Sequence, residues 1–262
     1  MSRQQIILVS IFVASFFGMY FGCDYVPKNH KKSGESEKVS ESRSGEEKMI
    51  EQARTALSPE QRSGLAVLEQ LLQTASSDTA KTSVLKKLSG EWYRMKNSAI
   101  SGIYARMVAE MEPSEKAWVI AGSMFQDGYQ QSEQDELRQY CTTNAISAFE
   151  KAVEYNPESV ENQISLALCY TDNPPQDNPM KGILMLRELD SKYPANPKVL
   201  FQLASLAMRT NQFDKAIARL EQILAVQPGN SSAICLLADA YKGAGKNDKA
   251  SLFAKKCESS LK

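Results

Sequence analysis

Two short segments of this chain share one design, and a proline closes each of them. They are NAISAFEKAVEYNP at 144–157 and DKAIARLEQILAVQP at 214–228. In the first, Ala145 is followed four positions later by Phe149, and the second has alanine and leucine at the matching positions. Residues four apart lie on one face of a helix. Such repetition strongly constrains the fold, because each copy must pack against the next.

The composition favours helices and disfavours catalysis. Lys plus Arg is 31 and Asp plus Glu is 31, so no net charge attracts nucleic acid. Helix-forming residues dominate from about residue 46, and no later stretch alternates like a strand. The single histidine, His30, lies ahead of that region, which therefore lacks the commonest general base. We expect no enzyme, no cofactor and no metal site.

An uncharged apolar run of 17 residues, 6–22, lies ahead of the helix-rich region. Its length is at the short end of a membrane-spanning helix, so we expect residues 1–23 to be a transmembrane anchor. Two alternatives stay open. In one, the segment is a lipoprotein signal with Cys23 as the lipidated residue. In the other, it is a cleaved signal peptide.

Residues 24–48 are rich in Ser, Gly, Glu and Lys and contain few apolar side chains. Such a segment cannot bury a core, so we expect a disordered linker. Three lysines after the apolar run favour a cytoplasmic position for the rest of the chain. The four later cysteines are scattered and are interpreted as small core residues rather than disulfide partners: Cys141, Cys169, Cys235 and Cys257.

The repeated segments together resemble the tetratricopeptide repeat (TPR), a helix–turn–helix unit of about 34 residues. The clearest unit has small and large residues at the expected places: Leu200, Leu203, Ala204, Ala207, Ala216, Leu220 and the closing Pro228. Pro194 and Pro228 are 34 residues apart. The resemblance implies an all-α, right-handed α-solenoid of about five helix pairs, preceded by the membrane helix and the linker. Its expected units are 82–115, 116–159, 160–196, 197–230 and 231–262, after capping helices at 49–81.

Three local signals refine this expectation. Ser58 before Pro59 predicts the start of a capping helix. In the second unit, about eleven extra residues predict one long second helix at 133–155, begun by a capping box of Ser132 and Asp135. Asn178 before Pro179 predicts the start of the next second helix.

The resemblance also implies a concave face, lined by the first helix of each unit, that binds a peptide or protein segment. After the packing positions are removed, the candidate partner-binding residues are Tyr93, Arg94, Gln126, Phe201, Ser205, Met208, Arg209, Asp239 and Lys242. Phe201 and Met208 have an alternative role as packing between units. The Lys/Asn/Arg set with which TPR cochaperones hold a C-terminal carboxylate is missing, which argues against chaperone tails.

The long second helix carries Leu137 and Tyr140 beyond the end of an ordinary repeat. We weigh two roles for this pair. It is either a protruding surface for a partner or for self-association, or internal packing covered by Phe125 and Tyr129.

The function that follows is a membrane-tethered, non-catalytic interaction scaffold, similar to bacterial single-span TPR proteins. An alternative is a TPR subunit of an envelope pathway such as cytochrome c maturation, and an enzyme without a known motif is a distant third. The expected partners are a protein or peptide, the membrane through the anchor, and a second copy in a homo-oligomer, with no nucleic acid. Because similar anchors project their repeats outward, we expect the extracytoplasmic (periplasmic) side despite the lysines.

Overall fold

The computed structural model describes residues 45–260 of the chain. It divides into two compact units, Met1–Ala53 and Arg54–Lys262, which are described separately. Of the first unit, the described part is helical and belongs to a helix at 45–55, which begins before the expected end of the linker at residue 48. The expected anchor at 1–23, its Cys23 and the linker up to residue 44 lie outside the described residues. Within 45–260, no helix is both long and apolar enough to cross a membrane.

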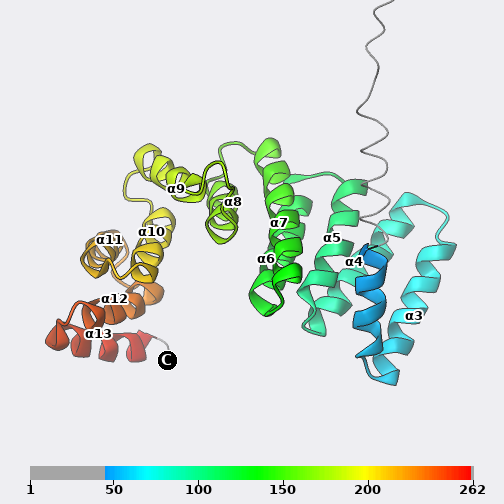
Figure 1. Ribbon diagram of the computed structural model, residues 1–262, viewed down its shortest axis with the longest axis horizontal. Helices are drawn as coiled ribbons and strands as arrows, with labels where there is room; N and C mark the ends of the chain where they lie inside the picture. The colour runs from blue at the N-terminus through cyan, green and yellow to red at the C-terminus, as the bar shows by residue number, and fades with distance from the viewer. Residues whose placement is uncertain (1–44, 261–262) are drawn as a thin grey trace, which may run out of the picture. The chain divides into compact units, whose positions relative to one another are not determined.

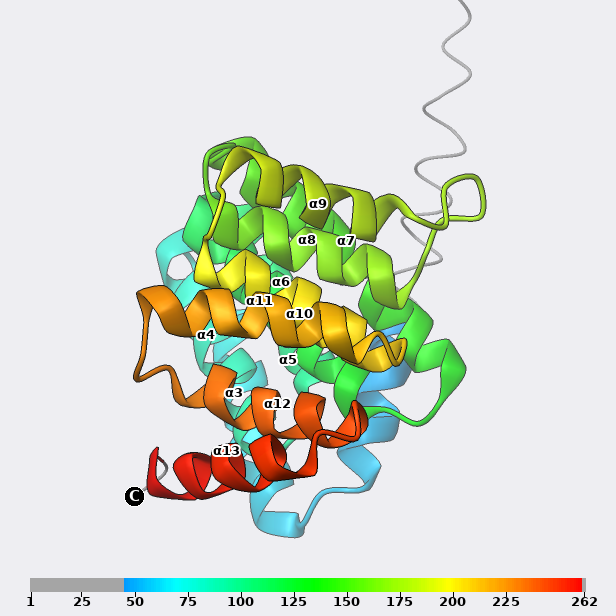
Figure 2. The ribbon, with the colours of Figure 1, turned by 90° about the vertical axis from the view of Figure 1, so that its left-hand side faces the viewer.

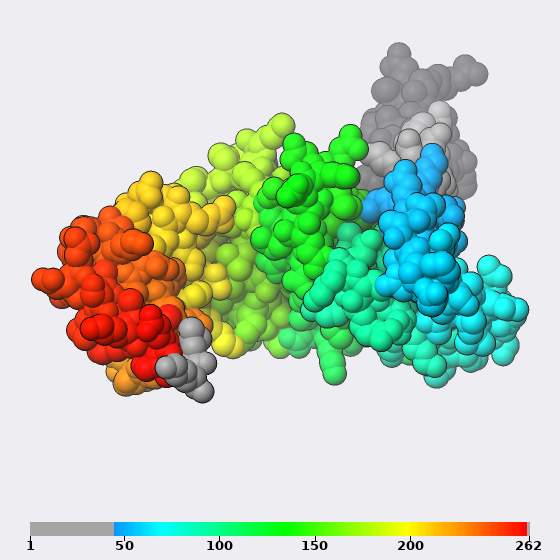
Figure 3. All heavy atoms as spheres, turned by 90° about the horizontal axis from the view of Figure 1, so that it is seen from below, coloured from blue at the N-terminus to red at the C-terminus, as the bar shows by residue number. Residues whose placement is uncertain are grey.

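The second unit is all-α, and no strand occurs among its described residues (Figure 1). Its helices are α3 Pro59–Thr74, α4 Asp78–Arg94, α5 Ser98–Met111, α6 Glu115–Gln131, α7 Asp135–Tyr155, α8 Val160–Asp172, α9 Lys181–Lys192, α10 Pro197–Arg209, α11 Phe213–Val226, α12 Ser231–Gly243 and α13 Asn247–Ser260. From α4 on they form five pairs, and the substantial contacts join helices that are next, or next but one, in chain order. The space-filling view shows the same order as a sequence of colours from cyan to red (Figure 3). This nearest-neighbour packing is typical of a repeat protein.

The ends of the second helices follow one rule. The helices α5, α7, α9 and α11 each end two residues before a proline, namely Pro113, Pro157, Pro194 and Pro228. A proline cannot continue a helix, because it lacks the backbone N–H and its ring clashes with the preceding turn. A polar N-cap residue then starts the first helix of the next pair, and its side chain accepts a hydrogen bond from a backbone N–H in the first turn of that helix. The four N-caps are Ser114, Ser159, Asn196 and Asn230.

The turns inside three of the pairs are also alike. Lys96, Asn211 and Gly245 follow α4, α10 and α12, and each has a positive φ near 60–70°. In each turn the next residue donates its backbone N–H to a carbonyl five positions earlier, at 2.8–3.0 Å. This is the Schellman arrangement, which satisfies the free carbonyls at a helix end. The same turn therefore reverses the chain at the same place in three units.

Successive helices approach closely where one of them carries a glycine. A Cβ on Gly102 of α5 would lie 2.7 Å from the Phe125 ring of α6. A Cβ on Gly122 of α6 would lie 2.9 Å from the Phe149 ring of α7. Both rings are almost fully buried, with at most 1% exposed. The missing Cβ atoms thus make the space that the aromatic rings of the next helix fill.

Of the helix starts predicted from the sequence, one is confirmed and the others are not. Ser58 does cap α3, and with Gln61 it forms a full capping box, so that prediction is confirmed. The long second helix is confirmed as α7, but its predicted capping box is wrong: Gln134 occupies the N-cap without a side-chain bond. Ser132 instead ends α6, and its hydroxyl accepts from the Gln134 N–H at 3.1 Å.

Asn178 and Pro179 do not start α9, which begins at Lys181 after Met180. The carbonyl of Asn178 accepts a hydrogen bond from the Lys181 N–H at 3.1 Å, so the two predicted residues form a turn ahead of the helix. Propensity at an N-cap was thus overridden by this preceding turn.

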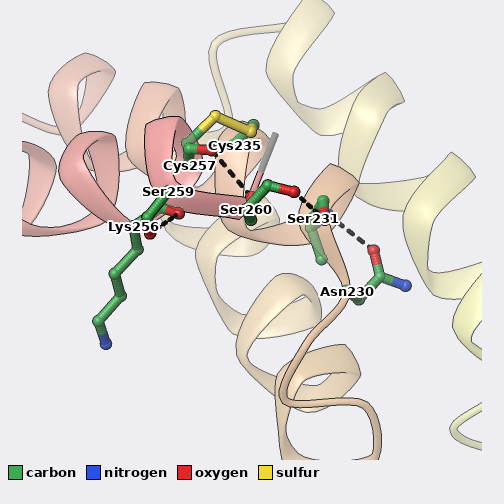
Figure 4. The surroundings of a disulfide bond; sticks show 8 residues. Asn230, Ser231, Cys235, Lys256, Cys257, Ser259 and Ser260 are labelled. Carbon is green, nitrogen blue, oxygen red and sulfur yellow. Dashed lines mark hydrogen bonds between the residues drawn. A yellow bond between two sulfur atoms is a disulfide. The ribbon is translucent and has the colours of Figure 1, made fainter. Parts of the chain in front are cut away.

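The last pair is joined by a disulfide between Cys235 of α12 and Cys257 of α13, with Cα atoms 4.8 Å apart (Figure 4). The interpretation of these two cysteines as core thiols is therefore wrong, because helix pairing places them opposite each other although they are 22 positions apart. Figure 4 also shows Ser231 pointing to Ser260, whose carbonyl accepts its hydroxyl at 3.4 Å. Closing such a loop with a disulfide stabilises a fold by about 3 kcal/mol. This support matters for α13, because none of its residues is fully buried.

We predict that Gly182→Ala destabilises the protein by about 1–3 kcal/mol. A Cβ at this position in α9 would lie 2.3 Å from the Ala167 carbonyl oxygen of α8, a backbone atom that cannot swing away. The measurement is the unfolding midpoint followed by circular dichroism.

Gly64→Ala is the matched control. Gly64 lies inside α3 and has nothing within 4 Å of an added Cβ, so this change should raise stability by up to about 1 kcal/mol through helix propensity. Equal midpoints for the two variants would contradict the close α8–α9 crossing.

Candidate partner-binding groove

A groove of about 790 Å³ runs between the first helices α4 and α6, with the second helix α5 as its floor. We call it the α4–α6 groove. Residues from all three helices and from the α5–α6 turn line it: Lys86, Ser89, Gly90, Tyr93, Ser101, Ala105, Val108, Glu112, Pro113, Ser114, Lys116, Ala117, Ile120 and Met124. Its volume lies in the range of sites that hold a small ligand or a few side chains.

The floor is fixed by hydrogen bonds across the α4–α5 crossing. The Ser89 hydroxyl donates to the Ser101 carbonyl at 3.0 Å, and the Ser101 hydroxyl donates to the Ser89 carbonyl at 2.8 Å. Small side chains continue the floor, since Ala105 is buried against Ala121 of α6 and Ala148 of α7. The floor is therefore low and rigid, and its two hydroxyl groups are already engaged.

The walls present large apolar side chains to solvent. Tyr93 of α4 is 48% exposed and Ile120 of α6 is 44% exposed, although both lie beside buried neighbours. Met124 continues the α6 wall and is half-buried. At the rim, Lys86 pairs with Glu112 at 2.6 Å. Apolar walls, a polar rim and a preformed floor are the usual features of a site that holds an apolar anchor of a protein ligand.

The structure does not bring the predicted partner-binding residues together in one site. Tyr93 lines the α4–α6 groove, whereas Arg94 pairs with Glu91 on its own helix. Gln126 is half-buried on α6, outside the groove lining. Asp239 and Lys242 are exposed on α12.

The candidates on α10 have mixed surroundings. Phe201 and Met208 pack against the C-terminal core, which is the alternative role stated for them. The Ser205 hydroxyl donates to the Phe201 carbonyl at 2.9 Å, and Arg209 pairs with Asp172 at 3.4 Å. A binding role for these residues stays a prediction.

Ile120 and Met124 line the groove but are absent from the residues predicted from the sequence, among which α6 has only Gln126. A usable signal existed, because Ala117, Ile120 and Met124 form an apolar stripe at helical spacing beside the packing stripe of Ala121 and Phe125. The two stripes together are too wide for one buried face.

The extended α6–α7 pair covers most of its own tip. The first helix lengthens too, so α6 and α7 have 17 and 21 residues, whereas α8 and α10 have 13 each. Tyr140 packs edge-on against Phe125, with ring centroids 5.9 Å apart. Arg138 donates to the Tyr129 hydroxyl at 2.7 Å, and Leu137 is half-buried. These contacts agree with the internal-packing role, and a contact role for Leu137 and Tyr140 stays a prediction.

Comparison with known proteins agrees with the helix pairing. Residues 181–234, from α9 into α12, match the family described as tetratricopeptide repeat. No match was found among curated protein sequences.

Solved structures with a similar fold include TTC0263, a thermophilic TPR protein in Thermus thermophilus. It is 18% identical, with a TM-score of 0.50 over 67% of this chain and 88% of that chain. The Cut9–Hcn1 hetero-tetramer of the APC/C is 14% identical, with a TM-score of 0.50 over 76% of this chain and 36% of that one. PilW, a type IV pilus biogenesis factor, is 20% identical, with a TM-score of 0.49 over 69% and 77%. At these identities the likeness concerns the fold alone.

We predict that Tyr140→Glu lowers the melting temperature, because a charge would replace the half-buried ring packed on Phe125. The expected loss is about 1–3 kcal/mol. Gln139→Glu is the control, since the neighbouring Gln139 is exposed and should tolerate the same charge. If both variants melt like the parent, the tip does not contribute to packing, and its role as a contact surface gains support.

Proposed function

Because this chain is a tetratricopeptide repeat protein, we propose that it is a non-catalytic scaffold that binds a protein segment in the α4–α6 groove. The proposal rests on one observation above all. Tyr93 and Ile120 stand about half exposed on the two walls of a groove whose floor is rigid and apolar. When a partner covers exposed apolar side chains that face a preformed groove, apolar surface leaves water and the free energy of binding becomes more favourable.

The ligand that fits this groove is a segment with one or two apolar anchors. Tyrosine is enriched where binding energy concentrates, because it buries a large area at a small entropic cost. Lys86, Glu112 and Lys116 at the rim can bind polar groups that flank such an anchor. The rim has charges of both signs, so we expect specificity for shape more than for net charge.

The groove lacks the arrangement that nucleophilic catalysis uses. Its lining serines bond each other's backbone across the α4–α5 crossing, and its one carboxylate, Glu112, pairs with Lys86. An activated nucleophile needs an adjacent base that is itself oriented by a third group. A binding role therefore accounts for the groove better than a reaction does.

We also propose that the scaffold is tethered to a membrane by residues 1–23, through the linker at 24–48, and works on the extracytoplasmic side. The apolar run at 6–22 supports the tether. The Cys235–Cys257 disulfide supports the side, since disulfides persist in oxidising compartments. We further propose that the repeat units have the bounds expected from the sequence and that the chain forms a homo-oligomer.

We predict that Ile120→Glu removes binding, because the glutamate charge would lie on the apolar wall of the groove. The fold should be kept, because Ile120 is 44% exposed. Peptides selected from a displayed random library on the purified full-length chain serve as ligands, and titration calorimetry measures their affinity. We expect a loss of at least about tenfold, which corresponds to about 1.4 kcal/mol.

Leu252→Glu on α13 is the matched control, because Leu252 is 52% exposed and lies outside the groove. Ligands that bind Ile120→Glu and Leu252→Glu equally well would refute the groove as the binding site. Melting curves of both variants check that the fold is intact.

If the repeats lie on the extracytoplasmic side, the cysteines should have a defined oxidation state in cells. When thiols are trapped by rapid alkylation, peptide mapping should find Cys235 and Cys257 joined. Cys141 and Cys169 should be labelled only after unfolding, because burial raises the pKa of each thiol to about 12. Alkylated Cys235 and Cys257 in trapped cells would contradict an extracytoplasmic location.

A further inference from the structure

A second groove, of about 480 Å³, opens between the second helices α9 and α11, with the first helix α10 as its floor. We call it the α9–α11 groove, and Figure 2 shows the three helices that form it. Its floor includes Leu203 and Leu206, and its walls carry Arg187 from α9 with Lys215 and Arg219 from α11. The α4–α6 groove has first helices as walls and a second helix as floor, so the two grooves open on opposite sides of the helix stack.

The three wall cations have no carboxylate partner among the described residues. Both acidic residues of α11 have partners elsewhere, since Asp214 pairs with Lys246 at 2.8 Å and Glu221 accepts from the Tyr241 hydroxyl. On α9, Glu188 lines a separate groove against α8, and Asp190 forms no ion pair with Arg187. The chain as a whole is neutral, so this separation of charge is local. Three like charges around one apolar floor repel each other unless a ligand neutralises them.

A fourth cation is already paired. Arg209, at the end of α10, lines the groove and lies 3.4 Å from Asp172 of α8, whose side chain is only 13% exposed. This pair fixes one end of the groove and leaves the charge of Arg187, Lys215 and Arg219 uncompensated. Lys215 donates to the Gln212 amide oxygen at 2.6 Å, which orients its ammonium group but does not neutralise it.

We propose that the α9–α11 groove binds an acidic protein segment that also carries an apolar side chain. Carboxylates of the segment would meet Arg187 and Lys215 on opposite walls, because charge-assisted hydrogen bonds to carboxylate suit both groups. An apolar side chain of the same segment would cover Leu206, which is half-buried beside the buried Leu203. A membrane surface is flat and cannot reach a recessed floor, and a duplex is too wide for this space, so a peptide fits the groove better than either. This site is additional to the α4–α6 groove and is formed by different helices.

The test uses the full-length chain and a short fluorescent peptide of alternating glutamate and leucine, followed by fluorescence anisotropy. We expect binding that weakens with added salt, and at least about tenfold weaker binding of the counterpart with glutamine in place of glutamate. Arg187→Glu and Lys215→Glu should each weaken the glutamate peptide by about tenfold or more. Both residues are exposed, so the fold should survive, and Arg187→Gln provides a second, milder variant.

Two controls make the outcome specific. Lys255→Glu reverses an exposed charge on α13 outside the groove and should leave binding unchanged. Ile120→Glu should also leave it unchanged, so that failure of the α4–α6 groove and failure of this one are separable. The proposal is overturned if the glutamate peptide does not bind the parent, or if folded Arg187→Glu and Lys215→Glu bind it as the parent does. It is equally overturned if phosphatidylglycerol vesicles or a DNA oligonucleotide bind through Arg187 in preference to the peptide.

Discussion

The close crossing of consecutive helices is the constraint on which the rest of this structure depends. At Gly102 and Gly122 the ring of the next helix fills the space that a Cβ would take, and at Gly182 the backbone of α8 itself fills it. Helices that approach this closely cannot slide along one another, because the interior has no free volume. The order and spacing of the helices are therefore set pair by pair, with few contacts beyond the next two helices.

Both grooves are consequences of that regular spacing. When helices alternate between two layers, each helix of one layer lies in the gap between two helices of the other. A gap remains an open groove where the floor residues are small or the wall residues point outward, as they do at Ala105 beneath Tyr93 and Ile120. The same geometry, taken from the other layer, gives the α9–α11 groove. The walls of the α4–α6 groove present the apolar Tyr93 and Ile120, whereas those of the α9–α11 groove present Arg187, Lys215 and Arg219.

Much of the fold could be predicted from the sequence, because the signals that define it are local. The proline two residues after each of four second helices, and the Ser or Asn that caps the next helix, depend only on backbone chemistry at those positions. The failures have a common cause in tertiary packing. Gln134 and Met180 precede α7 and α9 without a capping side chain, since the loops before them, and not local propensity, set where these helices start. The groove residues Ile120 and Met124 were not predicted, because two apolar stripes run side by side on α6. The Cys235–Cys257 pairing depends on which helices face each other, which spacing alone does not reveal.

Burial is unequal along the helices, and this bears on where binding is well defined. In α5, ten of the 14 residues are buried, among them Ser101 and Ala105, which form the floor of the α4–α6 groove. In α13 no residue is fully buried, and a disulfide, a tilted contact of Phe253 with Tyr241 and the bond from Ser231 to Ser260 hold it in place. Stability in such an array is a sum of nearest-neighbour terms, so a helix enclosed by two neighbours is fixed by packing and a helix with one neighbour needs other support. A groove whose floor is an enclosed helix keeps its shape without a ligand, which lowers the entropic cost of binding. That condition holds for α5 between α4 and α6, and it holds for α10 between α9 and α11, so both grooves are built on helices that their neighbours hold in place.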